Sequence, residues 1–454
     1  MSQAPASTAA DPALLTDLYQ LTMMQAYQRE GLHQPAVFDL FFRKLGDHRD
    51  YLLAAGLESV LSYLEGLRFG ERDLAYLESL GMFSPEFLDD LADFRFTGEV
   101  RAVPEGTPVF ADEPVIEVIA PLPQAQLIET FVLNQIHHQT LMASKAARVV
   151  DAAGDTPVVD FGARRMHGID ASLKAARAFH IAGVAATSNV LAGQAYGLPV
   201  SGTMAHSYIE AHADEATAFE AFAGTYPETV LLVDTYDTLA GVRKVADMAR
   251  RWGEAFRVRA IRLDSGDLGE LARRSRGILD DAGLTQVGIF ASGSLDEYAI
   301  ARLQAEGAPI DGFGVGTHMG VSADAPYLDS AYKLVEFAGE PRMKLASGKA
   351  TLPGRKQVFR DSAPDGTFVG DVIAGEDEAL AGTGLLRTVM RDGERLPEAA
   401  PTLEDAHAHA RQQRQCLPGA LRSPQMAATP YPVTVSEGLA AATQRLRRSL
   451  GASS

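Results

Sequence analysis

The stretch RAIRLDSGDL, residues 259–268, joins a short apolar run to the start of a helix through a turn that carries two carboxylates and a glycine. Similar apolar runs recur along the chain, at PVVDF (157–161), GVAATS (183–188), LPVSG (198–202), TVLLVD (229–234), VGIFAS (287–292) and GFGVG (312–316). Helices are predicted between most of these runs. Near-continuous apolar strands that alternate with helices are typical of a parallel sheet covered by helices. Seven runs, with AYKLVEF (331–337) as a candidate eighth, favour an irregular (β/α) barrel over an open doubly wound sheet.

The sequence on either side of this region lacks the regular alternation of apolar strands and helices. Residues 1–153 are predicted to form an N-terminal α+β domain, in which a first helix starts at Pro12 with Asp11 as its N-cap and a long helix leads into the barrel. The barrel is assigned to residues 154–340. Residues 341–454 contain short strands rich in proline and glycine, and we expect a small β-rich cap that packs on the N-terminal domain.

Composition narrows the class of protein. The 454 residues are 46% hydrophobic and 22% charged, which is typical of a globular protein. A net charge of −18 repels nucleic acid and anionic membranes, so neither is expected as a partner. Cys416 is the only cysteine, which excludes a disulfide within the chain and fits a reducing compartment. The first residues have no signal-peptide pattern and no long apolar run follows, so we predict a cytoplasmic protein.

Polar residues follow nearly every predicted strand. In a (β/α) barrel the active site gathers at the carboxyl ends of the strands. Here these ends continue as GARRMHG, SN, TMAHS, TYDT, SGDL, SGSLDE and THMG. Any one of these loops is also explained by helix capping, since caps favour serine, threonine and aspartate. The set as a whole indicates a site.

Two successive loops have the features of a phosphate site. ASGSLDE (291–297) offers Gly293 for close backbone approach, and Ser294 with Glu297 matches a capping box. GFGVGTHMG (312–320) places Gly316 and Thr317 at the next strand end. Backbone N–H groups at a helix start between the last barrel strands are a recurrent phosphate site.

Charged residues follow two other strands. Asp264 lies at a strand end, where a carboxylate suits Mg²⁺ or sugar hydroxyls, and Asp267 either joins it as a second Mg²⁺ ligand or only caps the following helix with Glu270. The motif FGARR (161–165) combines the Phe161 ring with two arginines, Arg164 and Arg165, a combination suited to a flat anionic ring.

His206, in GTMAHS (202–207), follows the third run, and Asp234 ends the fourth. The two side chains could therefore meet, in which case the carboxylate would fix the imidazole tautomer and raise its basicity. The residues alone leave open whether His206 is a nucleophile, a general base, a metal ligand or a polar residue at a helix start.

Taken together, these motifs resemble the nicotinate phosphoribosyltransferase family, which belongs to the type II phosphoribosyltransferases. The resemblance covers nearly the whole chain, from DLYQLTMMQAY (17–27) through FDLFFRKL (38–45), DFGARR (160–165), ATSN (186–189) and DTYDT (234–238) to KATLPGRKQVFR (349–360). It implies an enzyme that joins nicotinate to phosphoribosyl pyrophosphate, giving nicotinate mononucleotide in NAD salvage. ATP hydrolysis, a ligase-type coupling, would proceed through phosphorylation of His206, with Asp234 orienting the ring.

The same resemblance implies roles for further residues. Tyr19 and Phe161 would sandwich the pyridine ring, with Tyr19 supplied by the second subunit of a homodimer. The remaining substrate contacts would come from Arg165, Ser188, Thr203, Arg262, Asp264, Gly293, Gly316 and Thr317. Among these, Gly293, Gly316 and Thr317 would hold the 5-phosphate, and Asp264 the ribose or Mg²⁺. The nicotinamide-using relative has an aspartate where this chain has Ser188, so the serine favours nicotinate.

Two other functions are compatible with some of these features. A quinolinate phosphoribosyltransferase has a similar barrel, but that family's chains are shorter, lack DLYQ and carry more basic residues. A non-catalytic barrel that senses the nucleotide would not need His206 and Asp234 together. The catalytic function is therefore preferred.

Overall fold

The computed structural model describes residues 12–46, 48–346, 351–399 and 401–451. Contacts within the chain divide it into two compact units. Unit 1 combines Met1–Ser144 with Tyr327–Leu421 and Met426–Ser454, and unit 2 combines Lys145–Pro326 with Arg422–Gln425, in each case for the residues described. Asp11 and the first two residues of the 349–360 motif lie outside the described residues.

Unit 1 is built on a seven-stranded sheet whose described pairings are all antiparallel. In spatial order its strands are β13 (Glu340–Pro341), β12 (Ser330–Phe337), β1 (Pro35–Phe42), β5 (Pro114–Pro121), β3 (Glu99–Ala102), β17 (Arg387–Arg391) and β18 (Glu394–Arg395). The assignment of 331–337 as an eighth barrel strand is wrong, because β12 pairs antiparallel with β1. Only some of its side chains are buried, as in an antiparallel strand with one face on the core.

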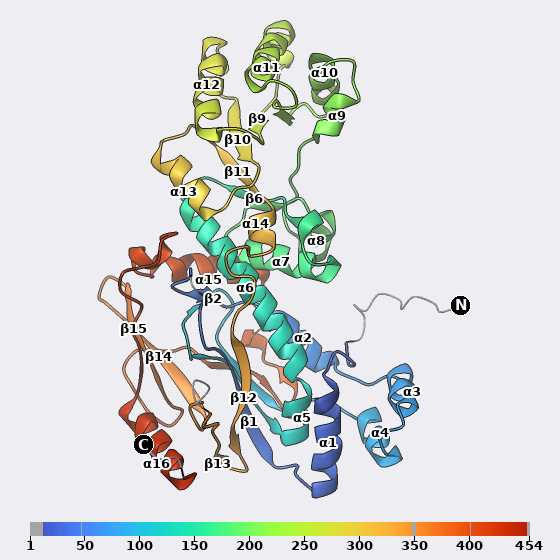
Figure 1. Ribbon diagram of the computed structural model, residues 1–454, viewed down its shortest axis with the longest axis vertical. Helices are drawn as coiled ribbons and strands as arrows, with labels where there is room; N and C mark the ends of the chain where they lie inside the picture. The colour runs from blue at the N-terminus through green and yellow to red at the C-terminus, as the bar shows by residue number, and fades with distance from the viewer. Residues whose placement is uncertain (1–11, 47, 347–350, 400, 452–454) are drawn as a thin grey trace. The chain divides into compact units, whose positions relative to one another are not determined.

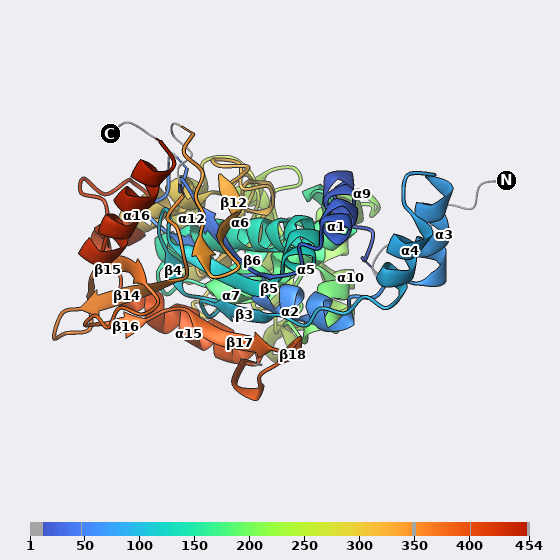
Figure 2. The same cartoon turned by 90° about the horizontal axis from the view of Figure 1, so that it is seen from below.

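A second sheet of unit 1 comes mainly from the C-terminal part of the chain. It has the order β16 (Thr383–Gly384), β14 (Lys356–Ser362), β15 (Phe368–Gly375) and β19 (Val433–Val435). Helix α16 (Glu437–Ser449) lies beside β15 (Figure 2). The short strands β2 (Leu52–Leu53) and β4 (Pro108–Val109) pair separately.

The first helix of the N-terminal part begins later than predicted. The first, α1 (Leu18–Glu30), has Asp17 as its N-cap rather than Asp11, and the Asp17 amide donates to Gln20 Oε1 at 2.9 Å. The predicted long helix is interrupted at Ile128. The described helices are α2 (Leu57–Gly66), α3 (Glu71–Ser79), α4 (Pro85–Ala92), α5 (Leu122–Leu127), α6 (Glu129–Ala153) and, near the C-terminus, α15 (Leu403–Gln415). In the described part of the chain no helix is both long enough and apolar enough to span a bilayer.

Unit 2 contains a curled parallel sheet, so the prediction of a parallel α/β region is confirmed. Its order is β7 (Ala186–Thr187), β6 (Val158–Asp160), β11 (Gly312–Val315), β10 (Gly288–Ser292), β9 (Ala260–Leu263) and β8 (Val230–Leu232). Among the described residues this sheet is a six-stranded half-barrel rather than the irregular barrel of seven or eight strands expected. The run 198–202 adds only a bridge from Val200 to Thr187, next to Pro199, which has no N–H to donate.

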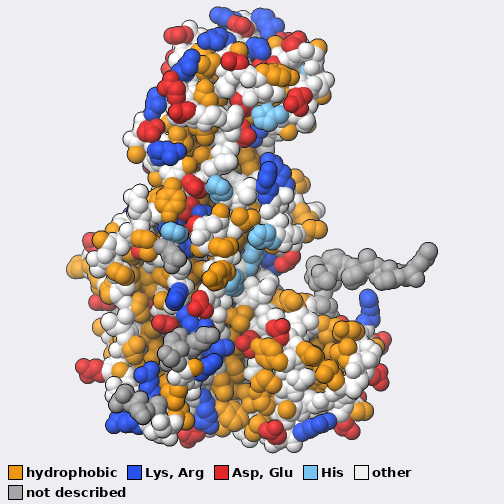
Figure 3. All heavy atoms as spheres, viewed as in Figure 1, with side chains coloured by type: hydrophobic (Ala, Val, Ile, Leu, Met, Phe, Trp, Pro, Cys, Tyr) orange, Lys and Arg blue, Asp and Glu red, His pale blue; other side chains and the backbone are white. Residues whose placement is uncertain are grey.

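Helices follow the strands of this sheet along the chain (Figure 1). They are α7 (Ile169–Ala182), α8 (Val190–Tyr196), α9 (His206–Glu210), α10 (Glu215–Thr225), α11 (Thr238–Trp252), α12 (Leu268–Asp281), α13 (Glu297–Ala305) and α14 (Thr317–Gly320). Helix α11 buries Val242 and Val245 on one face, and exposes Arg243 and Arg250 on the other. Charged side chains accordingly cover the outer surface of α11 and α12 in Figure 3.

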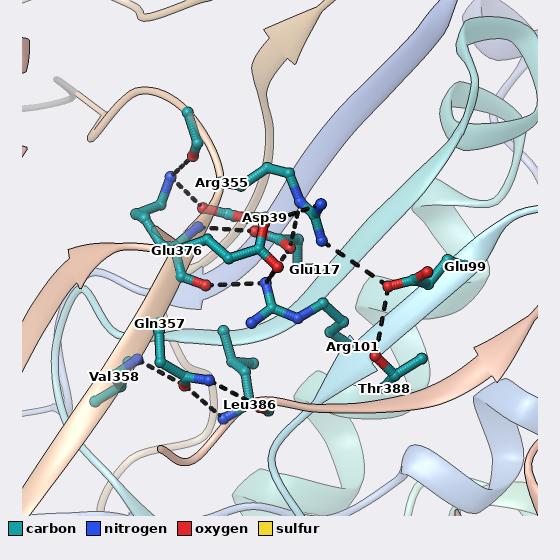
Figure 4. A network of polar contacts seen from close by, with 12 residues as sticks. Asp39, Glu99, Arg101, Glu117, Arg355, Gln357, Val358, Glu376, Leu386 and Thr388 are labelled. Atoms are coloured by element: carbon teal, nitrogen blue, oxygen red, sulfur yellow. Dashed lines mark hydrogen bonds and ion pairs between the residues drawn. The ribbon is translucent and has the colours of Figure 1, made fainter. Parts of the chain in front are cut away.

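A buried ion-pair network joins the two sheets of unit 1 (Figure 4). Glu117 on β5 is fully buried and accepts hydrogen bonds from Arg101 Nη1 at 2.6 Å, Arg355 Nε at 3.3 Å and the Lys356 amide at 3.0 Å. Lys356 Nζ lies 2.8 Å from Asp39 Oδ2 on β1. Burial raises the pKa of Asp39 to about 6, and the Lys356 ammonium offsets only part of this effect. Lys356 of the second sheet thus contacts both buried carboxylates of the first sheet, Asp39 and Glu117, and links the two sheets.

Replacing Glu117 with alanine is expected to destabilise the protein strongly, because Arg101 loses a carboxylate partner in a buried setting. The free energy of unfolding, measured by urea denaturation, should fall by about 3–5 kcal/mol. Arg391→Ala is the control, since that guanidinium is 59% exposed and lies 3.9 Å from Glu99. Its loss should be below about 1 kcal/mol. Equal losses for the two variants would contradict the importance of the network.

Candidate active site

The turns after β6 and β7 are held together by Asp160, a residue that the sequence analysis did not single out. Its buried carboxylate accepts hydrogen bonds from the Gly162 amide and the Thr187 hydroxyl, both at 2.7 Å. Burial raises the pKa of Asp160, although both hydrogen bonds favour the charged form. The Ser188 amide donates to the Asp160 carbonyl at 2.8 Å. Ser188 therefore lies next to the turn that carries Phe161.

Phe161 and Arg262 come together although 100 residues separate them. The Arg262 guanidinium lies 5.9 Å from the centre of the Phe161 ring and donates through Nη2 to the Met204 carbonyl at 2.9 Å. Its Nε is buried with no hydrogen-bond partner among the described residues. Burial also lowers the pKa of Arg262. The ring packs closely on β11, where a Cβ added to Gly314 would lie 2.5 Å from it. These residues form an aromatic surface next to a guanidinium with unused donor capacity.

Thr203 and Arg165 are less fixed by the fold. The half-buried Thr203 hydroxyl donates to the neighbouring Met204 carbonyl at 3.2 Å and to no other group of the described residues. Arg165 is exposed in the short helical turn Ala163–Arg165 that follows Phe161. Both side chains are accessible for a ligand.

His206 begins α9, and the structure gives it different neighbours from the one predicted. Its Nδ1 lies 3.1 Å from the Thr235 hydroxyl, and its Nε2 lies 4.0 Å from Asp264 Oδ2. Asp234, the predicted partner, instead accepts from the Asp264 amide at 2.9 Å and the Ser265 hydroxyl at 2.6 Å. The Asp234 carboxylate is therefore bonded to the turn after β9, and the contacts of the described residues include none between Asp234 and the imidazole. Thr235, adjacent to Asp234 in the sequence, supplies the contact with the ring.

Asp264 connects this histidine to the first of the two glycine loops. Its Oδ1 accepts from the Ser292 hydroxyl at 2.6 Å, and its side chain is 36% exposed. Gly293 has φ of +93°, and a Cβ there would lie 1.8 Å from the Asp264 carbonyl oxygen. Only glycine fits this position without moving the backbone.

The cap of α13 differs from the predicted capping box of Ser294 with Glu297. Asp296 is the N-cap and accepts from the Ala299 amide at 2.8 Å, whereas Glu297 is the first helical residue and is fully buried. Asp296 also lies 3.7 Å from His318, which follows Thr317 in the second loop. Gly316 is the residue before α14, and Thr317 is exposed. The two loops are therefore neighbours, as expected from their positions on adjacent strands.

The carboxylates of this region suit a cation that also binds substrate oxygens. Asp267 caps α12 by accepting from the Glu270 amide at 3.1 Å, which occupies one of its oxygens. In the described residues no group of three or more His, Cys, Asp or Glu side chains is arranged to hold a metal ion. Mg²⁺ commonly uses one or two carboxylates together with water and substrate phosphates, and the accessible Asp264 fits that mode.

Tyr19 belongs to unit 1, on α1, and its side chain is 46% exposed. Partial burial and the nearby Glu129 raise the pKa of its hydroxyl to about 12, so the phenol stays neutral at physiological pH. Its role in a site remains a prediction.

Comparisons with known proteins identify relatives of both parts of the chain. Residues 14–137 match the model of the nicotinate phosphoribosyltransferase N-terminal domain, and residues 156–337 match that of the nicotinate phosphoribosyltransferase family. The nicotinate phosphoribosyltransferase pncB2 of Mycobacterium tuberculosis is 56% identical over 96% of this chain and 94% of its own. The nicotinate phosphoribosyltransferase of Bacillus subtilis is 44% identical over 81% of this chain and 77% of its own. The crystal structure of human nicotinic acid phosphoribosyltransferase superposes with a TM-score of 0.84 and 30% identity, covering 95% of this chain and 99% of that one.

Gly293→Ala is expected to be far more damaging than the same change at another glycine with positive φ. Gly307, with φ of +61°, has nothing within 4 Å of an added Cβ, so Gly307→Ala should cost only about 1–2 kcal/mol of backbone strain. Gly293→Ala adds the collision with Asp264 and should cost at least about 2 kcal/mol more in urea denaturation. Equal losses would show that the close approach of the two turns is unimportant for stability.

Proposed function

The chain belongs to the nicotinate phosphoribosyltransferase family, as its motifs indicated, and we propose that it transfers the phosphoribosyl group of phosphoribosyl pyrophosphate to nicotinate. The products are nicotinate mononucleotide and pyrophosphate, in the salvage branch of NAD biosynthesis. One observation carries the proposal beyond family membership. The half-buried Phe161 ring lies beside the Arg262 guanidinium at the same sheet edge as Asp264 and the two glycine loops.

The ring site suits a flat aromatic carboxylate. The face of Phe161 provides stacking, and the half-buried Arg262 guanidinium beside it would provide a charge-assisted hydrogen bond for the nicotinate carboxylate. Ser188 offers a hydroxyl without the negative charge that would repel that carboxylate. Arg165 and Thr203, both accessible, would complete the contacts with the ring and the donor.

The transfer itself requires little covalent participation by the protein. The bond from ribose C1 to the pyrophosphate oxygen breaks, its electron pair leaves with pyrophosphate, and the pyridine nitrogen forms the new bond to C1 through an oxocarbenium-like transition state. Amides near Gly293, Gly316 and Thr317 would hold the 5-phosphate, while Asp264 would orient the ribose hydroxyls. When bound, Mg²⁺ neutralises pyrophosphate charge, and Asp264 with the free oxygen of Asp267 would hold it.

His206 would couple the reaction to ATP. A ring nitrogen of the neutral imidazole attacks the terminal phosphoryl group of ATP, a nitrogen–phosphorus bond forms, and ADP leaves. The Thr235 hydroxyl, at 3.1 Å, fixes the orientation of the ring. Asp234 would act indirectly, because it fixes the turn whose Asp264 faces His206. We further propose that the enzyme is a cytoplasmic homodimer in which Tyr19 of each subunit completes the pyridine site of the other.

A product assay tests the activity. Nicotinate, offered in parallel with nicotinamide and quinolinate, should be the preferred acceptor, and ATP should stimulate its conversion. His206→Ala should lose nicotinate-stimulated ATP hydrolysis by several orders of magnitude while retaining slow ATP-independent transfer, because the ring and donor sites remain. His212→Ala, in the loop after the same short helix, is the control and should retain both activities. Undiminished ATP hydrolysis in His206→Ala would exclude the phosphohistidine, and preference for quinolinate would exclude the proposed substrate.

Mixed dimers test whether sites are shared between subunits. Tyr19→Ala and His206→Ala should each be poorly active as homodimers, but a mixed dimer combines both defects in one site and leaves the other intact. Random exchange should then restore roughly a quarter of wild-type activity, since about half the dimers are mixed and each has one intact site of two. Activity no higher than the average of the two variants, after subunit exchange is verified, would contradict the role of Tyr19 across the interface.

A further inference from the structure

Lys145 is a buried lysine of unit 2 that the reaction described above does not use. It lies on α6, its side chain is 2% exposed, and its ammonium contacts two carboxylates from different parts of the sequence. Glu297 Oε2 lies 2.6 Å away and Asp324 Oδ1 lies 2.7 Å away. Burying a lysine is costly unless it is paired, and the two carboxylates offset that cost.

Glu297 is held from a second side by Arg148, one turn along the same face of α6. Arg148 Nε donates to Glu297 Oε1 at 2.9 Å, and its Nη2 donates to the Pro424 carbonyl at 2.7 Å. Burial alone would raise the pKa of Glu297, but Lys145 and Arg148 outweigh it and hold that pKa below its usual value. The cluster therefore contains two cations and two carboxylates, and its charges balance.

The two carboxylates stand just beyond the two glycine loops. Glu297 is the first residue of α13, directly after the loop from Gly293 to Asp296. Asp324 follows α14, the short helix that starts at Thr317 in the second loop. Lys145 thus connects the C-terminal sides of both loops through Glu297 and Asp324. Asp264 lies against the N-terminal side of the first loop, at Gly293.

We propose that Lys145, with Arg148, is a positioning residue that sets the spacing of the two loops and thereby the affinity for the 5-phosphate of phosphoribosyl pyrophosphate. This proposal rests on the proposed function for the identity of the ligand. A phosphate held by backbone N–H groups from two loops requires both loops in register, and a misplacement of about 1 Å can cost up to about 100-fold. Side chains in the loops themselves contribute no fixed positive charge, so geometry has to supply the affinity.

Lys145→Met tests the proposal, because it keeps most of the unbranched side chain and removes the ammonium group with its charge. The Kd for phosphoribosyl pyrophosphate, measured by calorimetry on the full-length protein, should rise about 10- to 100-fold. The KM for nicotinate should stay within about twofold, since the ring site lies on other strands. Lys145→Arg should restore most of the affinity. Asp324→Asn leaves both contacts of Glu297 in place, and should weaken binding even if Lys145→Met does not fold.

Lys356→Met is the matched control, because Lys356 is equally buried and paired, at 2.8 Å from Asp39, but belongs to unit 1. It should lower Tm without selectively raising the Kd for phosphoribosyl pyrophosphate. Unchanged affinity in Lys145→Met or Asp324→Asn, or an equal loss in Lys356→Met, would overturn the positioning role. A wild-type protein that binds phosphoribosyl pyrophosphate but forms no nicotinate mononucleotide would overturn the proposed function alone, since the binding comparison needs no turnover.

Discussion

A hydrogen bond from a hydroxyl to a buried or half-buried carboxylate recurs between neighbouring strand ends of unit 2, and the candidate site depends on it. Each bond is 2.6–2.7 Å long and joins residues from adjacent strands or their turns, namely Asp160 with Thr187, Asp234 with Ser265, and Asp264 with Ser292. Parallel strands bring their carboxyl ends to one edge, but they do not fix the side chains there. The repeated carboxylate–hydroxyl pair fixes these side chains, because charge-assisted hydrogen bonds in a partly buried environment are short and directional. These bonds therefore hold the side chains of the edge in defined positions.

This arrangement also explains how so acidic a chain can present a surface for phosphate-bearing substrates. Each of the carboxylates Asp160, Asp234 and Asp264 accepts at least one hydrogen bond from a donor within the protein, which reduces its negative potential where the loops open. Backbone amides of the glycine loops then provide the positive end of the local field. The one guanidinium with a free buried nitrogen, among the described residues of this edge, is Arg262. It lies where a ring carboxylate, rather than a phosphate, would be bound.

Sequence patterns predicted the parallel strands well, because buried strands in such a sheet are short, almost wholly apolar and followed by polar turns. They also placed Phe161, His206, Asp264 and Gly293 at one edge. They failed where a choice depended on contacts distant in sequence. Strand β12 has a composition compatible with either sheet, and only its pairing with β1 decides. Asp234 was predicted to contact His206, but its carboxylate accepts hydrogen bonds from the turn after β9 instead. Glu297 matched the sequence pattern of a capping box. In the structure its carboxylate accepts a hydrogen bond from Lys145, 152 residues earlier in the sequence, and Asp296 is the N-cap of α13.

The position of unit 2 within the sequence of unit 1 has a consequence for synthesis of the chain. One edge of β1 pairs with β5, which leaves the ribosome soon afterwards, but the other edge pairs with β12, roughly 300 residues later. At translation rates of about 5–20 residues per second, that edge waits for about 15–60 s. Unpaired edges of apolar strands invite association between nascent chains. The half-barrel is encoded between β5 and β12 and can fold during this interval. The risk of aggregation during synthesis therefore comes from the incomplete antiparallel sheet of unit 1 rather than from unit 2.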